Sequence, residues 1–398
     1  MRKILTILIY IINIPIYWLS ILVPQKKNLW VFGSWQGEKY TDNSKYLFEY
    51  VLKEKSDIEA IWLTSSKSVY VFMQSKKLPV YYSYSLQGYW LAMRANVHIY
   101  TNNSRDTNLY IWKKHIINLW HGIPLKKMGY DKGEIYRKKT ISIKAKIIRV
   151  LFPFLVPDHD RSVFIASSKE EASHLASSFG ININQIAVTG LPRNDVFIKD
   201  NNVEPPKIIL DYANLTKIIY MPTHRVNGKI SVFSFLEKDL LQINSYLKDI
   251  SSVLYVKLHF HHQSEIENLK EIYSNIVFLK DEDIDFDIYT VLPFMDILIT
   301  DYSSVYFDFL LSEKPIIFLP YDFDDYVEQE KGFYYDYDAF TPGPKATSWS
   351  DVLKYVDIYK KDSTIDLDKR KEIKKKIHDY KIESILENVY KMIKSRIK

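Results

Sequence analysis

Short apolar runs alternate with stretches of helical periodicity along most of this chain, and this alternation restricts the possible folds more than any other feature. The pattern is typical of α/β units that surround parallel sheets. We therefore expect doubly wound parallel sheets. The predicted strands are 28–32, 61–63, 97–100, 115–119, 163–166 and 186–189, followed by 217–221, 253–258, 276–279, 297–300 and 315–319.

The length of the chain and one polar segment predict where the domains divide. With 398 residues, the chain is longer than one ordinary hydrophobic core supports. Segment 201–206 ends in two prolines, which interrupt both helix and sheet. The expected parts are a membrane-associated segment at 1–27, an α/β domain at 28–200, a second α/β domain at 207–365 and a C-terminal helix at 366–398 that could return to the first domain.

The N-terminal segment predicts contact with a membrane. Ile4–Val23 contains no charged residue, and about 20 helical residues would be long enough to cross a bilayer. However, Asn13 and Pro15 interrupt its centre, and Tyr17 and Trp18 are typical of a membrane interface. A spanning helix and a shallow or re-entrant anchor therefore both stay open. A cleaved signal peptide is a third alternative, although no small-residue cleavage site follows the segment.

The composition excludes several kinds of chemistry. The chain has no cysteine, so it can form neither a disulfide framework nor a thiolate metal site. The net charge of +6 is modest, and the lysines are spread among acids, so we expect no nucleic-acid partner. Lysines near both termini could instead contact anionic lipid. No cluster of histidines and carboxylates has the spacing of metal ligands, and we expect no metal and no cofactor.

An acidic and hydroxyl-bearing junction follows one of the predicted strands. The apolar run 297–300 is followed by Asp301, Ser303 and Ser304. A helix that begins at either serine would leave backbone N–H groups unpaired and direct the positive end of its dipole toward them. Such a junction suits a phosphate oxygen. The alternative is that Asp301 and Ser303 only cap the helix.

Three further motifs also follow predicted strands, namely Trp120–Gly122, Pro222–Arg225 and Lys257–His259. Ligands of parallel sheets bind beyond the carboxyl ends of the strands, so these motifs are candidate site residues. Histidine is the natural base near neutral pH, and arginine offers a planar fork to phosphate oxygens. The alternatives are a histidine bonded in a tight turn and an arginine held in an ion pair.

In their order and spacing, these motifs resemble the CDP-glycerol glycerophosphotransferase family, whose members build teichoic-acid and related polymers in bacteria. Two doubly wound domains with a returning terminal helix also fit the GT-B architecture, in which an interdomain cleft would bring His121, Arg225, His259 and Asp301 together. The resemblance further includes Phe32–Gly37, Asp42–Tyr46, Leu119–Gly129, Thr189–Asp195 and Lys331–Asp336.

The resemblance implies transfer of glycerol phosphate from CDP-glycerol to a hydroxyl of a lipid-linked acceptor, with release of CMP. The N-terminal domain would then hold the acceptor and the C-terminal domain the donor. The implied catalytic residues are His121 and His259. The implied donor phosphate contacts are Arg225, His259, Ser303 and Ser304, and Asp301 is expected beside them. From their position after His121, we expect Gly122, Lys126 and Lys127 on the acceptor side, where the lysines would contact an acceptor phosphate; the alternative is that the lysines are only exposed to solvent.

Two departures from the family pattern leave the donor open. His224 stands where an aromatic residue is usual, and Phe260 stands where a proline is usual. CDP-ribitol is therefore an alternative donor. A GT-B glycosyltransferase that uses a sugar nucleotide and a non-catalytic nucleotide-binding scaffold are further alternatives. Because activated nucleotides occur inside the cell, we expect the protein on the cytoplasmic face of the cell membrane, with homo-oligomers possible and with primase and polymerase roles both open.

Overall fold

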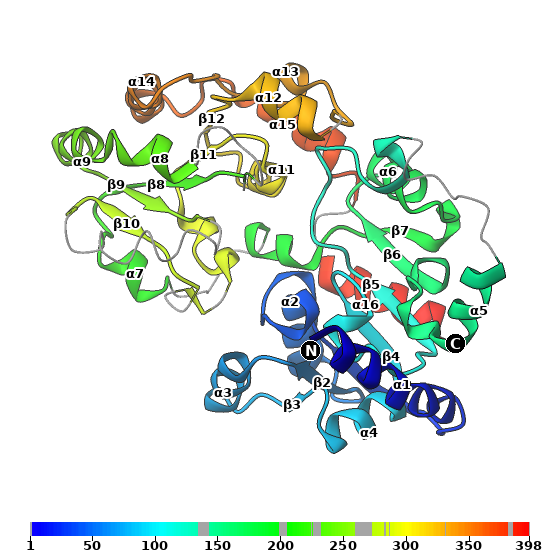
Figure 1. Ribbon diagram of the computed structural model, residues 1–398. Coiled ribbons are helices and arrows are strands. Elements are labelled where there is room, and N and C mark those ends of the chain that lie inside the picture. The colour runs from blue at the N-terminus through cyan, green and yellow to red at the C-terminus, as the bar shows by residue number, and fades with distance from the viewer. Residues whose placement is uncertain are drawn as a thin grey trace. The chain divides into compact units, whose positions relative to one another are not determined.

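The computed structural model describes residues 2–133, 143–198, 205–223, 225, 232–258, 273–281, 284–285, 287–330, 332–380 and 385–397. The chain forms two compact units, each with its own parallel sheet (Figure 1). Unit 1 comprises Met1–His121, Glu134–Asp195 and Tyr380–Lys398, and unit 2 comprises Gly122–Gly133 and Val196–Asp379.

Unit 1 contains a seven-stranded parallel sheet with the order β3-β2-β1-β4-β5-β6-β7. Every neighbouring pair is parallel, as the alternating pattern predicts. The short strand β3 was not predicted, because its three residues give too short a pattern. The strands are β1 (Lys26–Phe32), β2 (Glu59–Thr64), β3 (Val80–Tyr82), β4 (Ala95–Tyr100), β5 (His115–Asn118), β6 (Ser162–Ala166) and β7 (Ile186–Val188).

Several helices of unit 1 begin at a serine that caps the first turn. For example, the Ser168 hydroxyl accepts the Glu171 N–H before α6, and Gly180 ends that helix in the left-handed region. The helices are α1 (Arg2–Ser20), α2 (Asp42–Glu54), α3 (Lys67–Ser75), α4 (Leu86–Arg94), α5 (Ile143–Leu151), α6 (Lys169–Phe179) and α16 (Ile385–Arg396).

Unit 2 contains a five-stranded parallel sheet with the order β10-β9-β8-β11-β12, and all five strands were predicted. Its strands are β8 (Thr216–Met221), β9 (Ser252–Val256), β10 (Ile276–Phe278), β11 (Ile297–Thr300) and β12 (Ile316–Phe318). Its helices are α7 (Lys207–Leu210), α8 (Val232–Glu237), α9 (Leu240–Asp249), α11 (Val305–Phe309), α12 (Phe323–Glu330), α13 (Tyr337–Phe340), α14 (Trp349–Lys361) and α15 (Leu367–Ile377). Apolar residues of the sheet, α9 and α14 form one core.

The division into units differs from the expected domains at several places, and near the predicted linker the boundary lies between Asp195 and Val196. Segment 122–133 belongs to unit 2 rather than to the N-terminal part. The expected single helix at 366–398 is two helices, of which α15 belongs to unit 2 and α16 to unit 1. Helix α16 packs on α2, where the Glu387 carboxylate lies 2.7 Å from the Lys55 ammonium and accepts a hydrogen bond from Tyr50.

Helix α1 packs one face on the rest of unit 1 and exposes another. The helix continues through Pro15, and Asn13 is buried, where its side-chain oxygen accepts a hydrogen bond of 2.8 Å from the Tyr89 hydroxyl. Leu5, Leu8 and Ile12 are exposed. Among the helices in the described ranges, none is both long and apolar enough to cross a membrane.

The strand order places the candidate site residues. In unit 1 the order reverses between β1 and β4, and in unit 2 it reverses between β8 and β11. The carboxyl ends of strands at such a reversal are where open α/β sheets bind ligands.

Candidate active site

His121 lies three residues after β5 in a turn with left-handed backbone on both sides. Trp120 has φ 50° and Gly122 has φ 136°. Only glycine adopts the second conformation without strain, and positive φ at a tryptophan is costly. Such strain persists where the surroundings hold it, and it concentrates at functional sites.

The contacts of His121 define which ring nitrogen can act as a base. The Nδ1 atom lies 3.3 Å from the carbonyl oxygen of Thr101, which can only accept a hydrogen bond. Nδ1 therefore carries the proton, and Nε2 keeps its lone pair. The half-buried ring packs beside Trp120 and Trp35, with centroids 4.0 Å and 5.5 Å away. These contacts are those of a histidine hydrogen-bonded in a tight turn, which was the alternative prediction. In this arrangement Nε2 is still available to accept a proton.

Two residues from the motifs that resemble the family, Arg193 and Asn43, stabilise the turn around His121 by hydrogen bonds to its backbone. The Arg193 guanidinium donates to the carbonyl oxygen of His121 and pairs with Asp42, both at 2.9 Å. The Asn43 amide donates to the carbonyl oxygens of Leu119 and Trp120 at 3.0 Å and 2.9 Å. Both residues lie in motifs that carry the family resemblance, but no role was predicted for either of them.

The electrostatics keep His121 neutral. Burial lowers the pKa of His121, the Asp42 carboxylate and the bond to Thr101 raise it, and Arg193 lowers it further. Because the lowering effects prevail, the pKa lies below its ordinary value of 6.5. The imidazole is therefore mostly in the base form at neutral pH.

Asp106 is a buried residue that sequence reasoning missed. Its carboxylate accepts backbone N–H groups from Gln36 at 2.7 Å, Thr101 at 3.0 Å and Asn102 at 2.8 Å. Burial raises the pKa of Asp106 to about 6, and these N–H groups oppose the rise. Asp106 thereby joins the loops after β1 and β4, both of which contact His121.

In unit 2, Arg225 forms a buried cluster with two carboxylates. Its guanidinium pairs with Asp301 at 2.8 Å and with both carboxylate oxygens of Asp322 at 2.7 Å and 2.9 Å. The arginine side chain is only 4% exposed. The rings of Tyr302 and Tyr326 each lie 5.0 Å from the guanidinium carbon.

The ion-pair alternative therefore describes Arg225 in this structure. The fork that was expected to face donor phosphates is occupied by carboxylates, and a phosphate contact stays a prediction. Asp301 accepts the N–H of Thr223 at 2.8 Å, so it joins the ends of β8 and β11. Asp322 was missed, although it follows β12, the neighbour of β11, and a survey of every strand end would have included it.

The two serines after β11 form fewer contacts than Arg225 and Asp301 do. Ser303 and Ser304 are half-buried, and no hydrogen bond of either hydroxyl is found in the described part of the chain. Ser304 occupies the N-cap position of α11 without a side-chain cap. His259 and His224 lie outside the described residues, whereas Lys257 pairs with Asp281 at 2.6 Å.

The three expected acceptor-side residues lie in unit 2. The Lys127 N–H donates to the Gly332 carbonyl at 3.1 Å, and Lys126 forms an antiparallel bridge with Phe333. Gly122 begins this segment. Their role toward an acceptor stays a prediction. Within the described ranges, no group of three or more histidines and carboxylates could hold a metal ion.

Fold and site together define an α/β protein of two doubly wound units, with polar residues gathered at the ligand-binding edge of each sheet. Residues 16–395 match the model of the family described as CDP-glycerol:poly(glycerophosphate) glycerophosphotransferase. The chain belongs to this family, which confirms the family and the class of enzyme predicted from the motifs.

Relatives and a solved structure agree with this assignment. The chain is 29% identical over 343 residues to the teichoic acid glycerol-phosphate transferase of Staphylococcus aureus, covering 83% of this chain and 84% of the relative. It is 29% identical over 357 residues to the teichoic acid poly(glycerol phosphate) polymerase of Bacillus spizizenii, covering 86% and 87%. A structure of the wall teichoic acid polymerase TagF matches with a TM-score of 0.76 and 24% identity over 94% of this chain and 90% of that one, which shows a shared fold.

Proposed function

We propose that the protein transfers glycerol phosphate from CDP-glycerol to a hydroxyl of a lipid-linked acceptor and releases CMP, with His121 as the base. Membership of the family and the names of the two relatives support the reaction. The observation that carries the role of His121 is its geometry. Its Nδ1–H is directed to the Thr101 carbonyl, which leaves a neutral Nε2 for the acceptor proton.

The proposed step needs little covalent help from the protein. The acceptor oxygen attacks the phosphorus nearer the glycerol while Nε2 takes its proton. The bond from that phosphorus to the bridging oxygen breaks, and CMP leaves with the electron pair. The protein must position the hydroxyl and stabilise charge on the phosphates.

We place the donor phosphates at the ends of β8 and β11 in unit 2. Ser303 and Ser304 have hydroxyls available there, and Arg225 is the nearby cation. For Arg225 to bind phosphate, the phosphate oxygens would have to replace Asp322. His259 and a GT-B arrangement of the two units belong to this proposal.

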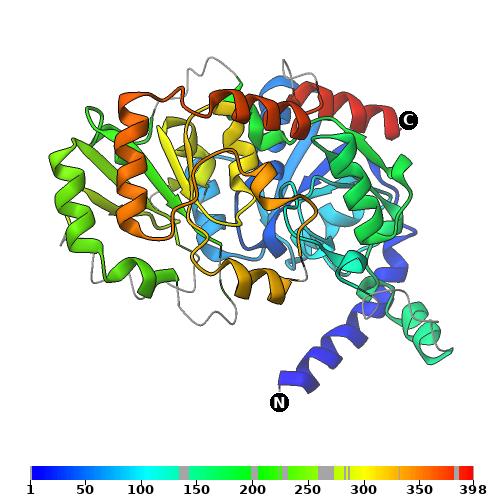
Figure 2. The ribbon, with the colours of Figure 1, turned by 90° about the horizontal axis from the view of Figure 1, so that it is seen from above.

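We also propose that unit 1 lies on the cytoplasmic surface of the cell membrane through α1 and α5. The two helices extend from the same side of unit 1 (Figure 2). Leu5, Leu8 and Ile12 of α1 are exposed, as are Ile147 and Val150 of α5. Large exposed apolar patches are rare on soluble proteins, and an interfacial helix buries such side chains among lipid head groups.

Release of CMP tests the reaction and the base together. Purified protein would receive CDP-glycerol, CDP-ribitol or a UDP-sugar, each with a lipid-linked disaccharide acceptor. We expect CMP from CDP-glycerol, and its loss in His121→Ala. The matched control is His115→Ala at the other end of the same strand, which should stay active. Release only from CDP-ribitol would reassign the donor, and full activity of His121→Ala would refute the base.

A further inference from the structure

Three cations line one cavity in unit 1, which we call the cationic cavity. It has a volume of about 290 Å³, and its lining includes Lys113, Arg149 and Arg161 with a single acid, Asp158. The cations come from three separate segments, namely the loop before β5, helix α5 and the turn before β6. The cavity therefore has an excess of positive charge.

Lys113 is built into this cavity rather than placed on the surface. It is 3% exposed, and its ammonium donates to the carbonyl oxygens of Asn108 at 2.7 Å and Ile111 at 3.2 Å. An ammonium has three donors, so one N–H is left for a ligand. Burial lowers the pKa of Lys113 to about 8, the Asp158 carboxylate opposes this shift, and Arg161 adds to it.

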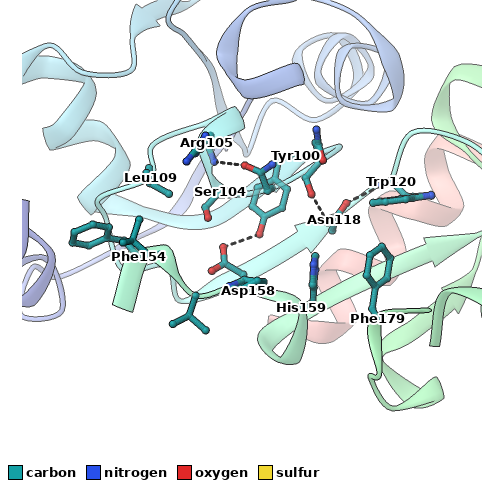
Figure 3. Close-up of a pocket in the computed structure, with 15 residues that line it drawn as sticks. Tyr100, Ser104, Arg105, Leu109, Asn118, Trp120, Phe154, Asp158, His159 and Phe179 are labelled. Carbon is teal, nitrogen blue, oxygen red and sulfur yellow. Dashed lines mark hydrogen bonds between the residues drawn. The ribbon is translucent and has the colours of Figure 1, made fainter. Parts of the chain in front are cut away.

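No carboxylate of the described ranges forms an ion pair with any of the three cations. Asp158 instead accepts a hydrogen bond of 3.0 Å from the Tyr100 hydroxyl, as Figure 3 shows. Arg161 donates to the Lys113 carbonyl, and its guanidinium lies 5.5 Å from the Trp112 ring centroid. Lys113 is buried, and a buried cation is costly without a counter-ion. Because the exposed Arg149 and Arg161 add two more positive charges to the same cavity, the cavity suits an anion.

The surroundings indicate that the anion is attached to a lipid. Tyr17 of α1 and Arg149 of α5 line the cavity, and both of these helices have exposed apolar side chains. Tyr17 also packs with Leu109 and Phe154 in an apolar cluster at the base of α1. A phosphate held here would have its hydrocarbon chain beside the two helices.

A second cavity adjoins this site, and its lining includes Trp120, the residue before His121. It has a volume of about 350 Å³, and it shares Ser104, Phe154 and Asp158 with the cationic cavity. Its far side is lined by Trp120, the neighbour of His121, and by the amide of Asn118 (Figure 3). The head group of a bound lipid could therefore extend along this cavity as far as Trp120, whose ring packs against that of His121.

We propose that Lys113, Arg149 and Arg161 bind the phosphate or diphosphate of the lipid-linked acceptor, which directs the acceptor's head group through the second cavity toward His121. This inference rests on the proposed function. It places the acceptor phosphate in unit 1, whereas the sequence suggested Lys126 and Lys127, which lie in unit 2.

The test uses a double variant of the exposed cations, because Lys113 is buried and its replacement could prevent folding. Arg149→Gln with Arg161→Gln is compared with Lys114→Gln plus Lys146→Gln, which removes the same charge from exposed neighbours outside the cavity. Full-length protein is assayed with a disaccharide linked to a polyprenyl diphosphate in phosphatidylcholine vesicles, and with a soluble disaccharide glycoside that has no phosphate.

We expect the arginine double variant to raise the KM for the diphosphate acceptor about tenfold or more, and to leave the KM for the glycoside and for CDP-glycerol within about twofold. The lysine double variant should match the wild type. Equal effects of the two double variants, or equal effects on the two acceptors, would overturn the proposal.

Two further measurements are included. The first distinguishes the acceptor phosphate from the phosphate of bulk phospholipid, and the second distinguishes a failure of this proposal from a failure of the proposed function. If the arginine variant loses binding to vesicles that contain phosphatidylglycerol but keeps the acceptor KM, the cations bind bulk phospholipid and the proposal is wrong. If the wild type releases no CMP with any acceptor, the proposed function fails, but calorimetric titration with geranyl diphosphate still tests the site. Binding that weakens about tenfold in the arginine variant supports the site, and no binding by the wild type refutes it.

Discussion

At the scale of single residues, opposing effects on one imidazole decide whether this protein has a base at neutral pH. Burial lowers the pKa of His121, and the carboxylate of Asp42 raises it. Arg193 neutralises part of that carboxylate at 2.9 Å. The balance favours neutral imidazole, so proton transfer to Nε2 needs no prior deprotonation at pH 7.

This balance predicts the acidic limb of the pH–rate profile. Activity should fall as the pH drops through the pKa of His121, so the inflection of kcat/KM should lie below pH 6.5. Asp42→Asn removes a charge that favours the imidazolium, and it should move the inflection to lower pH. Asp57→Asn, at an exposed acid of the same unit, serves as the control and should not move it. An upward shift in Asp42→Asn would contradict the assigned electrostatics.

Arg225 allows a prediction about stability. Arg225→Ala leaves Asp301 and Asp322 without their counter-charge, and breaking a buried pair in this way costs about 3–5 kcal/mol. Urea unfolding should therefore show a large loss. Lys354→Ala, which removes an exposed partner of Asp351, should cost less than about 1 kcal/mol. Similar losses in the two variants would show that the cluster contributes little to stability.

At the scale of elements, α1 shows how a single helix serves two environments. Its buried face includes Asn13, which would be costly in lipid but here bonds to Tyr89. Its exposed face includes Leu8 and Ile12. The polar residue that seemed to interrupt a membrane segment is therefore part of the contact with unit 1.

The exposed face of α1 predicts how the protein binds vesicles. Leu8→Ser with Ile12→Ser should weaken cosedimentation with lipid vesicles by about tenfold or more, because each buried aliphatic side chain contributes about 1.5–3 kcal/mol. Ile183→Ser, at another exposed apolar position of unit 1, should bind like the wild type. Circular dichroism checks that each variant is folded. Unchanged binding of the double variant would exclude α1 as the contact.

At the scale of the whole molecule, each unit has its own sheet and reversal of strand order, so each ligand should stabilise the unit that binds it. CDP-glycerol at about 100 times its Kd should stabilise its unit by about 2.7 kcal/mol. Hydrogen exchange should then slow at the ends of β8 and β11 more than in β2 and β3. CMP and glycerol added separately provide the control. Protection restricted to unit 1 would contradict a donor site in unit 2.

Local patterns were sufficient for the family and for every strand of the described residues except β3, which is too short to give a pattern. A strand such as 297–300 can be predicted because neighbouring residues determine both its apolar run and the point where it ends. The family can be identified because the order of the motifs along the chain is sufficient, and no contact between residues needs to be known. The partners of Arg225 were not predictable in this way. Asp322 is 97 positions away, and only the pairing of β11 with β12 brings it near.

The sequence by itself determined that this protein is built from parallel α/β units, that it belongs to the glycerophosphotransferase family and that His121 follows a strand. Only the tertiary structure decided the rest. It turned Nδ1 of His121 toward Thr101, occupied the fork of Arg225 with carboxylates and gathered Lys113, Arg149 and Arg161 around one cavity. The reason is physical: a pKa, an ion pair or a cavity depends on groups that approach each other in space, and their separation along the chain does not specify that approach.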